Sequence, residues 1–554
     1  MSAEVRARDG LRLEVAGREI AGGLRPPSTR GGWNYLLGLP ALVLLVLLMA
    51  PMAWTLVWAL SAPWGAGNFV DVLTDPDALS AAWHSVVWVV IGVVLLVAAY
   101  VIAVLSRVVS RLWRVLLYLM ILPFGVSAMV SGAVFRMIFD PEPERGTASA
   151  LVPGITWLGP DLIWWVLGSA FTWSWLGFAV VLFRAGLDAN TGLGHRFGRL
   201  TLPRVGPAGS IVVLTVLVAA IRVFDLVLIA APGSIFGDVD VVGLLWWRMT
   251  TGSTETGAPA ALAVLLFAVV AVLSLFGTRG IGRGLPAQPV PMAEPSSERT
   301  RWWSWVIGVV VCLMWTMPLV VLVGTAFHTP AAAGTGGWWR LDGLGFASFA
   351  AVADTWLWPA LMRSMSIAVP ATVLVVACAV PAAYMLTWRL PSRVADALTV
   401  LLGVLAVAPV QMYAGPLSNL FAGSPALISL VHAAAGLPFA TLVLRAAFAA
   451  APRAGTEARP SLDAVWRRGR YRPALVAVTV LEFVLVWNDF IVSFLIGGPA
   501  DSPLALLLWG EARQFATSSG PVAAGAVVSA LIPVVILLAT WRTVVTGLTG
   551  GMVR

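Results

Sequence analysis

The chain has 554 residues, of which 59% are hydrophobic and 11% are charged, and its mean hydropathy is +0.90. A water-soluble protein of this length could not bury so large an apolar share, so the composition excludes an ordinary globular protein and predicts a membrane protein. All 35 basic residues are arginine, and they gather in short loops between apolar stretches. The net charge of +8 therefore reflects membrane topology and does not indicate nucleic-acid binding.

The amino-terminal residues 1–33 contain six arginines and no apolar run, so we expect a polar cytoplasmic tail there and no signal peptide. Twelve apolar stretches follow. Within lipid, a segment of roughly 20 apolar residues must satisfy its backbone internally, which predicts helices and an all-α polytopic fold. The expected spans are 36–60, 83–106, 113–139, 162–183, 208–231, 258–277, 303–326, 363–388, 395–416, 426–449, 474–496 and 521–543.

The loops alternate in charge along the chain. Arginines crowd the loops at 107–114, 184–204, 389–393 and 445–472, whereas the loops at 61–82 and 140–161 are mainly acidic. Arginine-rich loops stay on the cytoplasmic side of a membrane. This asymmetry predicts that both termini are cytoplasmic, as an even number of spans requires.

The twelve stretches form two sets of six. In the fifth stretch of each set, Arg222 and Asn488 lie at the same distance from Pro207 and Pro473. Residues 279–301 between the sets are rich in Gly, Pro, Ser and Arg, a composition typical of an extended linker. We therefore expect a first membrane domain over 34–278 and a second over 302–554, with the two repeats in the same orientation.

Ionisable side chains at membrane depth are costly, and they usually face a cavity or a partner. The fifth stretches carry such residues beside aromatic rings, which could bind a solute through hydrogen bonds and ring faces. An interhelical clamp or an interface cap would use the same residue types. The candidate pathway residues are Arg222, Phe224, Asp225, Glu482, Trp487, Asn488 and Asp489.

Several short strings of sequence occur in a characteristic order. They are Leu122–Phe139, Leu202–Pro207, Ala382–Tyr384, Leu437–Ala440, Trp487–Phe490, Leu531–Val534 and Gly547–Gly551. In these strings the chain resembles a pair of carbohydrate-uptake ABC permeases of the maltose-permease kind, joined into one polypeptide. The resemblance implies a type I importer fold in a bacterial cell membrane. It also implies two cytoplasmic ATPase subunits and an extracytoplasmic solute-binding protein as partners.

In this family, a short helix in the loop between the fourth and fifth spans couples the permease to its ATPase. Both corresponding loops are shortened and depart from the family pattern, so docking on an ATPase competes with a purely topological role or contact with anionic lipid. The candidate coupling residues implied by the resemblance are Arg196, Gly198, Arg199, Pro203, Glu457, Ala458 and Arg459.

The sequence indicates neither catalytic residues nor a cofactor. A phosphate-binding loop requires a lysine, which is absent, so ATP would be used by partner subunits. Cys312 and Cys378 lie inside expected spans, and the four histidines are scattered, so neither a disulfide nor a metal site is predicted. Two alternatives stay open: an ion-coupled secondary transporter with twelve spans, and a degenerate permease homologue that no longer transports.

Overall fold

The computed structural model describes residues 36–61, 65–106, 119–189, 193–197, 200–203, 205, 207–252, 255–282, 288–289, 302–421, 424–450, 460–467, 469–497, 502–512 and 515–548. The expected amino-terminal tail and most of the linker lie outside these ranges. The proposed domain boundaries therefore stay predictions, although the first helix after the linker begins at Trp302, where the second domain was expected.

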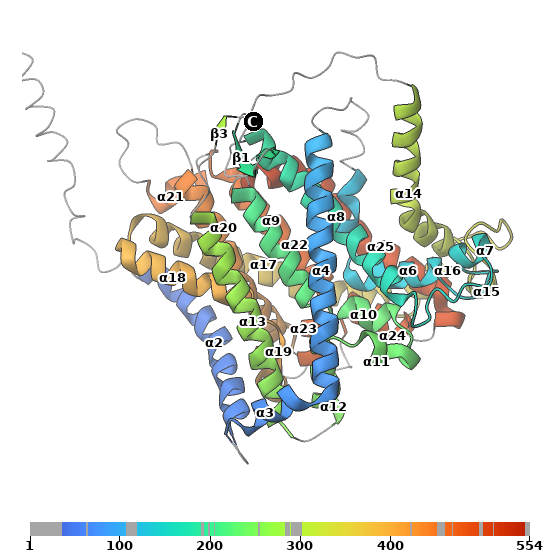
Figure 1. Cartoon of the computed structure of the whole chain (residues 1–554), viewed down its shortest axis with the longest axis horizontal. Helices are drawn as coiled ribbons and strands as arrows, with labels where there is room; N and C mark the ends of the chain where they lie inside the picture. Colours follow the sequence, from blue (N-terminus) through green and yellow to red (C-terminus); the bar gives the residue numbers. More distant parts are fainter. Residues whose placement is uncertain are drawn as a thin grey trace, which may run out of the picture.

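Eight helices are long and apolar enough to cross a membrane, and they correspond to the first, second, fourth and sixth expected spans of each set (Figure 1). Each presents apolar side chains around most of its circumference, as expected for a helix that meets both lipid and protein. Their bounds are α2 Leu39–Leu60, α4 Pro76–Leu105, α8 Ile163–Ala189, α13 Gly257–Gly282, α14 Trp302–Ala326, α17 Leu357–Trp388, α20 Pro425–Ala450 and α25 Phe515–Leu548. The chain is an all-α multi-pass membrane protein in its main body.

The third and fifth expected spans of each set are interrupted, whereas the sequence predicted continuous helices. Proline accounts for two interruptions, because Pro123 and Pro409 lie at the breaks and cannot donate a backbone hydrogen bond. The other two occur at acidic residues. The resulting pairs are η2 Leu122–Gly125 with α6 Ala128–Ile138, α9 Pro207–Ile221 with α10 Asp225–Ala230, α18 Ser392–Leu405 with α19 Gln411–Phe421, and α22 Arg472–Asn488 with α23 Ile491–Ile496.

The two sets thus share one order of long and interrupted spans. Their first helices, α2 and α14, both run downward in Figure 1, α2 toward α3 and α14 toward α15. The fourth spans also carry a common motif, Leu176–Ala179 in α8 and Leu437–Ala440 in α20, and Arg184 and Arg445 follow at the same distance. These features are those of parallel repeats related by an axis along the membrane normal.

Equivalent pairs of helices pack on each other across the contact between the two sets. Helix α2 of the first set packs on α19 of the second, and α14 of the second set packs on α6 of the first. The Thr55 hydroxyl of α2 donates a hydrogen bond to Met412 O over 2.7 Å. The Trp173 indole of α8 donates to Trp315 O of α14 over 2.9 Å. Because the first span of each set completes the broken third span of the other, the two sets form one continuous hydrophobic core.

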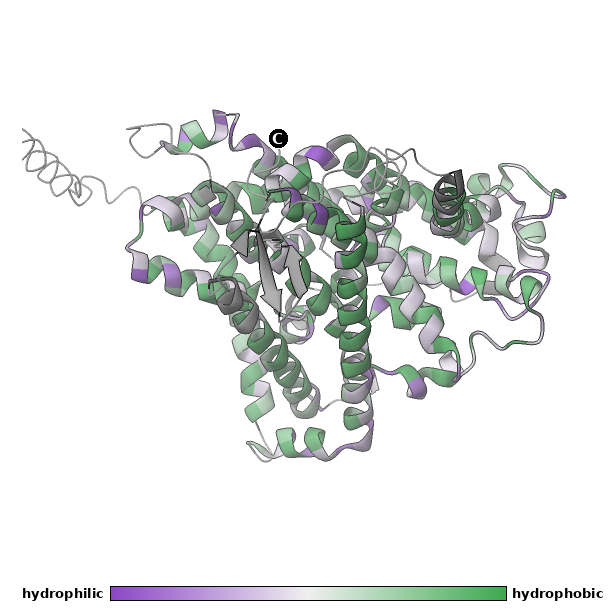
Figure 2. Cartoon of the chain, turned by 45° about the horizontal axis from the view of Figure 1, so that its top comes forward, coloured by the Kyte–Doolittle hydropathy of each residue, from purple (hydrophilic) through white to green (hydrophobic). Residues whose placement is uncertain are grey.

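Shorter elements connect the spans at both membrane sides. Helices α3, α11 and α12 lie at the opposite side of the molecule from α21 and the carboxyl end, and Figure 2 shows hydrophilic residues concentrated at helix ends and in loops. Their bounds are α3 Gly67–Thr74, α7 Thr147–Leu151, η3 Gly233–Ile235, α11 Phe236–Val239, α12 Val242–Gly252, α15 Pro330–Thr335, α16 Ala347–Ala353, α21 Leu462–Arg467 and α24 Leu504–Ala512.

A small antiparallel sheet departs from the all-α expectation. Strands β1 (Leu193–Phe197) and β2 (Leu200–Pro203) form a hairpin in the loop between α8 and α9. Strand β3 (Gln288–Pro289), from the linker, pairs with β1, so the order is β2-β1-β3. The linker therefore contacts the loop of the first set that the sequence identified as a coupling loop.

Candidate functional site

The breaks in the two fifth spans place polar side chains between the two sets. In the first set, α9 ends at Ile221 and α10 begins at Asp225. In the second set, α22 ends at Asn488, and the Asp489 carboxylate accepts a hydrogen bond from Val492 N at the start of α23 over 2.9 Å. An acidic side chain can stabilise a helix start in this way, because the first backbone N–H groups of a helix lack partners.

Charged groups from both sets gather at these breaks. Asp225 is close enough to Asp489 and Arg222 for electrostatic interaction, and Arg222 also acts on Asp489. The buried Tyr413, at the start of α19, interacts with Arg222 and Asp489. The structure therefore brings together three of the expected pathway residues from the two sets. Tyr413 was missed because a single tyrosine in an apolar stretch carries no pattern of its own.

Asn488 bridges the two sets directly. Its Nδ2 donates to Gly125 O of η2 over 3.2 Å, while its Oδ1 is buried without a hydrogen-bond partner among the described residues. Gly125 also touches α25, since a Cβ added to it would lie 2.9 Å from Cγ2 of Val534. The broken third span of the first set thus meets the broken fifth span of the second.

Helix α20 supplies the other polar contacts of this region. His432 Nε2 lies 3.8 Å from Asp489 Oδ2, a contact that no pattern in the sequence predicts. The Glu482 carboxyl group is buried against Gly436, whose added Cβ would lie 2.3 Å from Oε2. Glu482 therefore lies inside the second set, between α20 and α22, and Asp489 lies at the contact between the sets.

Four aromatic rings surround the breaks. Phe224 lies 6.5 Å from Trp247 and 6.3 Å from Phe494, measured between ring centroids, and Phe490 stacks on Phe494 at 4.8 Å. Phe224 and Phe490 are fully buried, so this level of the molecule is closed in the structure. Trp487 serves a different contact: its indole donates to Ser529 O over 2.9 Å and holds α22 against α25.

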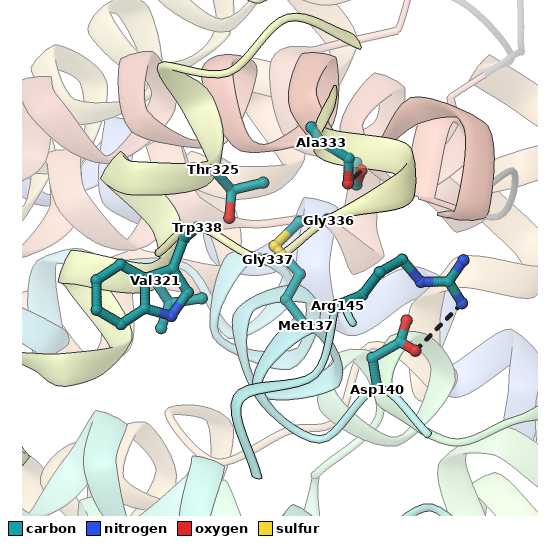
Figure 3. Close-up of a pocket in the computed structure, with 10 residues that line it drawn as sticks. Met137, Asp140, Arg145, Val321, Thr325, Ala333, Gly336, Gly337 and Trp338 are labelled. Atoms are coloured by element: carbon teal, nitrogen blue, oxygen red, sulfur yellow. Dashed lines mark hydrogen bonds and ion pairs between the residues drawn. The ribbon is translucent and has the colours of Figure 1, made fainter. Parts of the chain in front are cut away.

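A pocket opens between the sets on the side away from α21. Figure 3 shows Met137, Asp140 and Arg145 of the first set facing Thr325 and Trp338 of the second. Arg145 pairs with Asp140 at 3.2 Å and donates to Gly334 O over 3.5 Å. The Trp338 indole donates to the Thr147 hydroxyl over 3.0 Å. The two hydrogen bonds between the sets, from Arg145 to Gly334 and from Trp338 to Thr147, form the outer clasp.

Comparisons with known proteins find permease proteins that are similar to this chain. The osmoprotective compounds uptake permease protein GgtD of Synechocystis is 27% identical over 268 residues, which cover 44% of this chain and 89% of that protein. The alpha-glucoside transport system permease protein AglG of Rhizobium meliloti is 31% identical over 215 residues, or 35% of this chain and 56% of that protein. A probable ABC transporter permease protein of Pyrococcus horikoshii is 26% identical over 254 residues, or 38% of this chain and 84% of that protein. The chain is a homologue of ABC-transporter permease proteins. No family model matches it.

The lengths of these matches bear on the repeat. Two relatives are covered almost completely by less than half of this chain. A permease homologue of this length therefore has room for two such proteins, as the two six-span sets in the structure also indicate.

The coupling loops differ between the two halves of the permease homologue. In the first half, the expected short helix is wrong: Arg196 lies in β1 and Pro203 in β2, because the shortened loop closes as a hairpin. Gly198 and Arg199 lie outside the described residues. In the second half, Glu457, Ala458 and Arg459 also lie outside them, and a short helix, α21, follows instead.

The segment just before α21 is tied to the membrane domain at an aromatic cluster. The Tyr384 hydroxyl donates to Pro460 O over 3.0 Å and accepts from Arg389 Nη2 over 2.7 Å. Trp388 stacks on Phe448 at 5.4 Å, next to Tyr471. No signal in the coupling-loop pattern pointed to this cluster, which depends on aromatic residues from α17 and α20 and on Tyr471, the residue before α22.

Helix α21 also has an outward face. Val465 is fully buried, whereas Trp466 is 47% exposed and Arg467 pairs with Asp463 at 2.8 Å on the surface. A partly exposed tryptophan beside charged residues is typical of a protein contact or of a membrane interface.

Among the described residues, no group of three or more His, Cys, Asp or Glu side chains could hold a metal ion.

Proposed function

We propose that this chain forms the complete membrane pathway of an ABC importer for a sugar or a related hydroxyl-rich solute. The observation that carries the proposal is the meeting of both broken fifth spans, where Arg222, Asp225, Asn488 and Asp489 lie at the contact between the halves. Carboxylate, amide and guanidinium groups beside aromatic rings can bind hydroxyl groups and ring faces of a sugar. The names of the relatives, which refer to osmoprotective compounds and alpha-glucosides, support this class of solute.

Movement of the solute requires alternating access around this level. The buried rings of Phe224 and Phe490 close the pathway at the breaks of the fifth spans. The outer clasp closes it at the pocket between the halves. Opening and closing the halves in turn would expose the polar groups first to one side of the membrane and then to the other. Helix breaks suit such movement, because they leave backbone groups available to line a cavity.

The energy would come from two cytoplasmic ATPase subunits, and an extracytoplasmic solute-binding protein would deliver the solute. We place both termini, the hairpin β1–β2 and α21 in the cytoplasm of a bacterium, because arginines concentrate in these loops. The ATPases would then meet a hairpin on one half and α21, with Trp466, on the other. ATP hydrolysis belongs to these partners, and the chain itself needs no cofactor.

The test is uptake by the purified transporter in proteoliposomes. The chain is isolated from its native membrane together with its bound ATPases, and uptake of a labelled alpha-glucoside is followed with its solute-binding protein present. We expect uptake only when ATP is supplied, and a loss of at least about tenfold for Asp489→Asn, if the charged group contributes one or two kcal/mol to passage. Asp71→Asn, on the exposed surface of α3, is the matched control.

Two results would contradict the proposal. Uptake that continues without ATP and collapses with the proton gradient would indicate a secondary transporter. A complex in which the solute and its binding protein leave ATP hydrolysis unchanged would indicate a homologue that no longer transports.

A further inference from the structure

The loop between α15 and α16 exposes large apolar side chains. In this outer loop, residues 336–346, Leu341 is 84% exposed and Phe346 is 71% exposed, and Leu344 and Trp339 are also exposed. Exposed apolar groups close together are costly in water, and they usually mark a surface that contacts a protein or a membrane.

The outer loop has a fixed conformation. His328 lies between two backbone carbonyl groups, with Nδ1 2.7 Å from Gly324 O and Nε2 2.8 Å from Arg340 O. Thr329 N donates to Gly343 O over 2.8 Å, and Gly343 has a φ of +78° that favours glycine. The apolar side chains are therefore presented by an ordered backbone, which could not withdraw them from the surface without losing these hydrogen bonds.

The exposed surface continues an exposed apolar face of α14, one of the helices able to cross a membrane. The large exposed apolar residues of α14 fall mainly on one face of the helix; they are Val306, Val309, Val310, Leu313, Met314, Val320 and Val323. Phe327 comes next on this face, and its ring lies 5.3 Å from that of Phe346. The apolar surface thus runs from the membrane span directly into the outer loop.

Polar groups in the outer loop fit the headgroup region. Arg340 Nε lies 3.0 Å from Asp342 Oδ1, on either side of Leu341. This hydrogen bond lowers the pKa of Asp342 and keeps the pair charged. A tryptophan, an arginine and apolar tips within a few residues are typical of segments that lie at the boundary between headgroups and acyl chains.

We propose that the outer loop inserts Leu341, Leu344 and Phe346 into the extracytoplasmic leaflet of the membrane. The partner is the lipid itself. The inference rests on the continuity with α14 and is independent of the transported solute. Its consequence for the transporter is mechanical, because Gly336, Gly337 and Trp338 of the same loop line the pocket between the halves (Figure 3). The membrane would thus hold in place Trp338, a residue that the second half contributes to the outer clasp.

Depth measurements test this placement. Leu341→Cys is made with Cys312→Ala and Cys378→Ala, labelled with a nitroxide and reconstituted into lipid nanodiscs without any partner protein. We expect the label to favour collisions with oxygen over a water-soluble nickel chelate, at a depth of about 5–10 Å below the headgroups. Asp161→Cys, at an exposed position before α8, is the matched control and should be freely accessible to the chelate.

A second measurement guards against local disturbance by the label. A small fluorophore at Leu344→Cys should be quenched by lipids that carry a quencher high on the acyl chain. Labels at both positions that remain accessible to the nickel chelate would overturn the proposal. So would labels that become protected only when the solute-binding protein is added, since the loop would then be a protein docking surface.

Discussion

Position 436 is a glycine, which leaves room for a carboxyl group inside the second half. Gly436 lies on α20, and Glu482 of α22 fills the space beside it. In the first half, the corresponding positions of the repeated motifs are occupied by Trp175 and Val216. The pair of a glycine and a buried acid therefore occurs at these positions in the second half and not in the first.

Gly436→Ala should destabilise the protein for this reason. The added Cβ would lie 2.3 Å from Glu482 Oε2, so the carboxyl group or the helix must move. We expect a loss of about 1–3 kcal/mol in the free energy of unfolding. Thermal unfolding followed by tryptophan fluorescence in nanodiscs measures this loss.

Two further variants give the controls. Gly510→Ala, in α24, meets nothing within 4 Å and should leave stability unchanged or slightly raised, because alanine favours helix. The double variant Gly436→Ala with Glu482→Ala should recover part of the loss. Equal destabilisation of the single and double variants would show that the Glu482 carboxyl group is not what fills the space.

At the level of elements, the interrupted spans limit how much could be predicted. The eight uninterrupted spans follow from hydropathy alone, since a long apolar run has few alternatives in lipid. The break near Pro409 had a visible cause, but the breaks at Asp225 and Asp489 did not, because neither break contains a proline or a glycine. The sequence identified Arg222, Asp225, Asn488 and Asp489 as a group, whereas their partners Tyr413 and His432 come from other helices and depend on packing.

The coupling loops show the same limit. The shortened first loop could form either a hairpin or a helix, and pairing with β3 of the linker is a contact between distant residues that no local pattern indicates. In the second half, α21 begins after a Ser461 side chain that accepts a hydrogen bond from Ala464 N over 3.2 Å. That capping signal is visible in the sequence, whereas the coupling-loop pattern of the family covers the residues before it.

The outer clasp gives a prediction at this scale. Trp338→Phe keeps the ring and removes the hydrogen bond to Thr147, which should shift the equilibrium toward an open outer side by about 0.5–1.5 kcal/mol. Thr325→Cys, buried in the pocket and made without the native cysteines, reports this opening. We expect an impermeant maleimide to label it about two to ten times faster in the Trp338→Phe background.

Trp339→Phe is the matched control, because it changes the neighbouring and more exposed indole of the same loop. Labelling at the wild-type rate is expected there. If both variants accelerate labelling equally, the effect belongs to the loop as a whole and the hydrogen bond to Thr147 does not hold the clasp.

Considered as a whole molecule, the chain consists of two sets of spans that share one core. The first span of each half packs on the broken third span of the other half. Helix α2 packs on α19, and α14 packs on α6. The sixth spans also pack on the third span of the other half, α13 on α18 and α25 on η2. Such reciprocal packing leaves neither half with a complete core of its own.

The linker should accordingly be dispensable once the halves have assembled. A protease site inserted between residues 290 and 301 allows the purified protein to be cut in nanodiscs, and we expect the two fragments to stay together on size exclusion. The apolar contacts between α2 and α20 and between α13 and α18 would hold them, since separation would leave these helix faces without partners. The rate at which Thr325→Cys is labelled should also be unchanged by cutting. Fragments that separate, or a pocket that becomes more accessible, would show that the covalent link and the pairing of β3 with β1 are needed to hold the two halves in register.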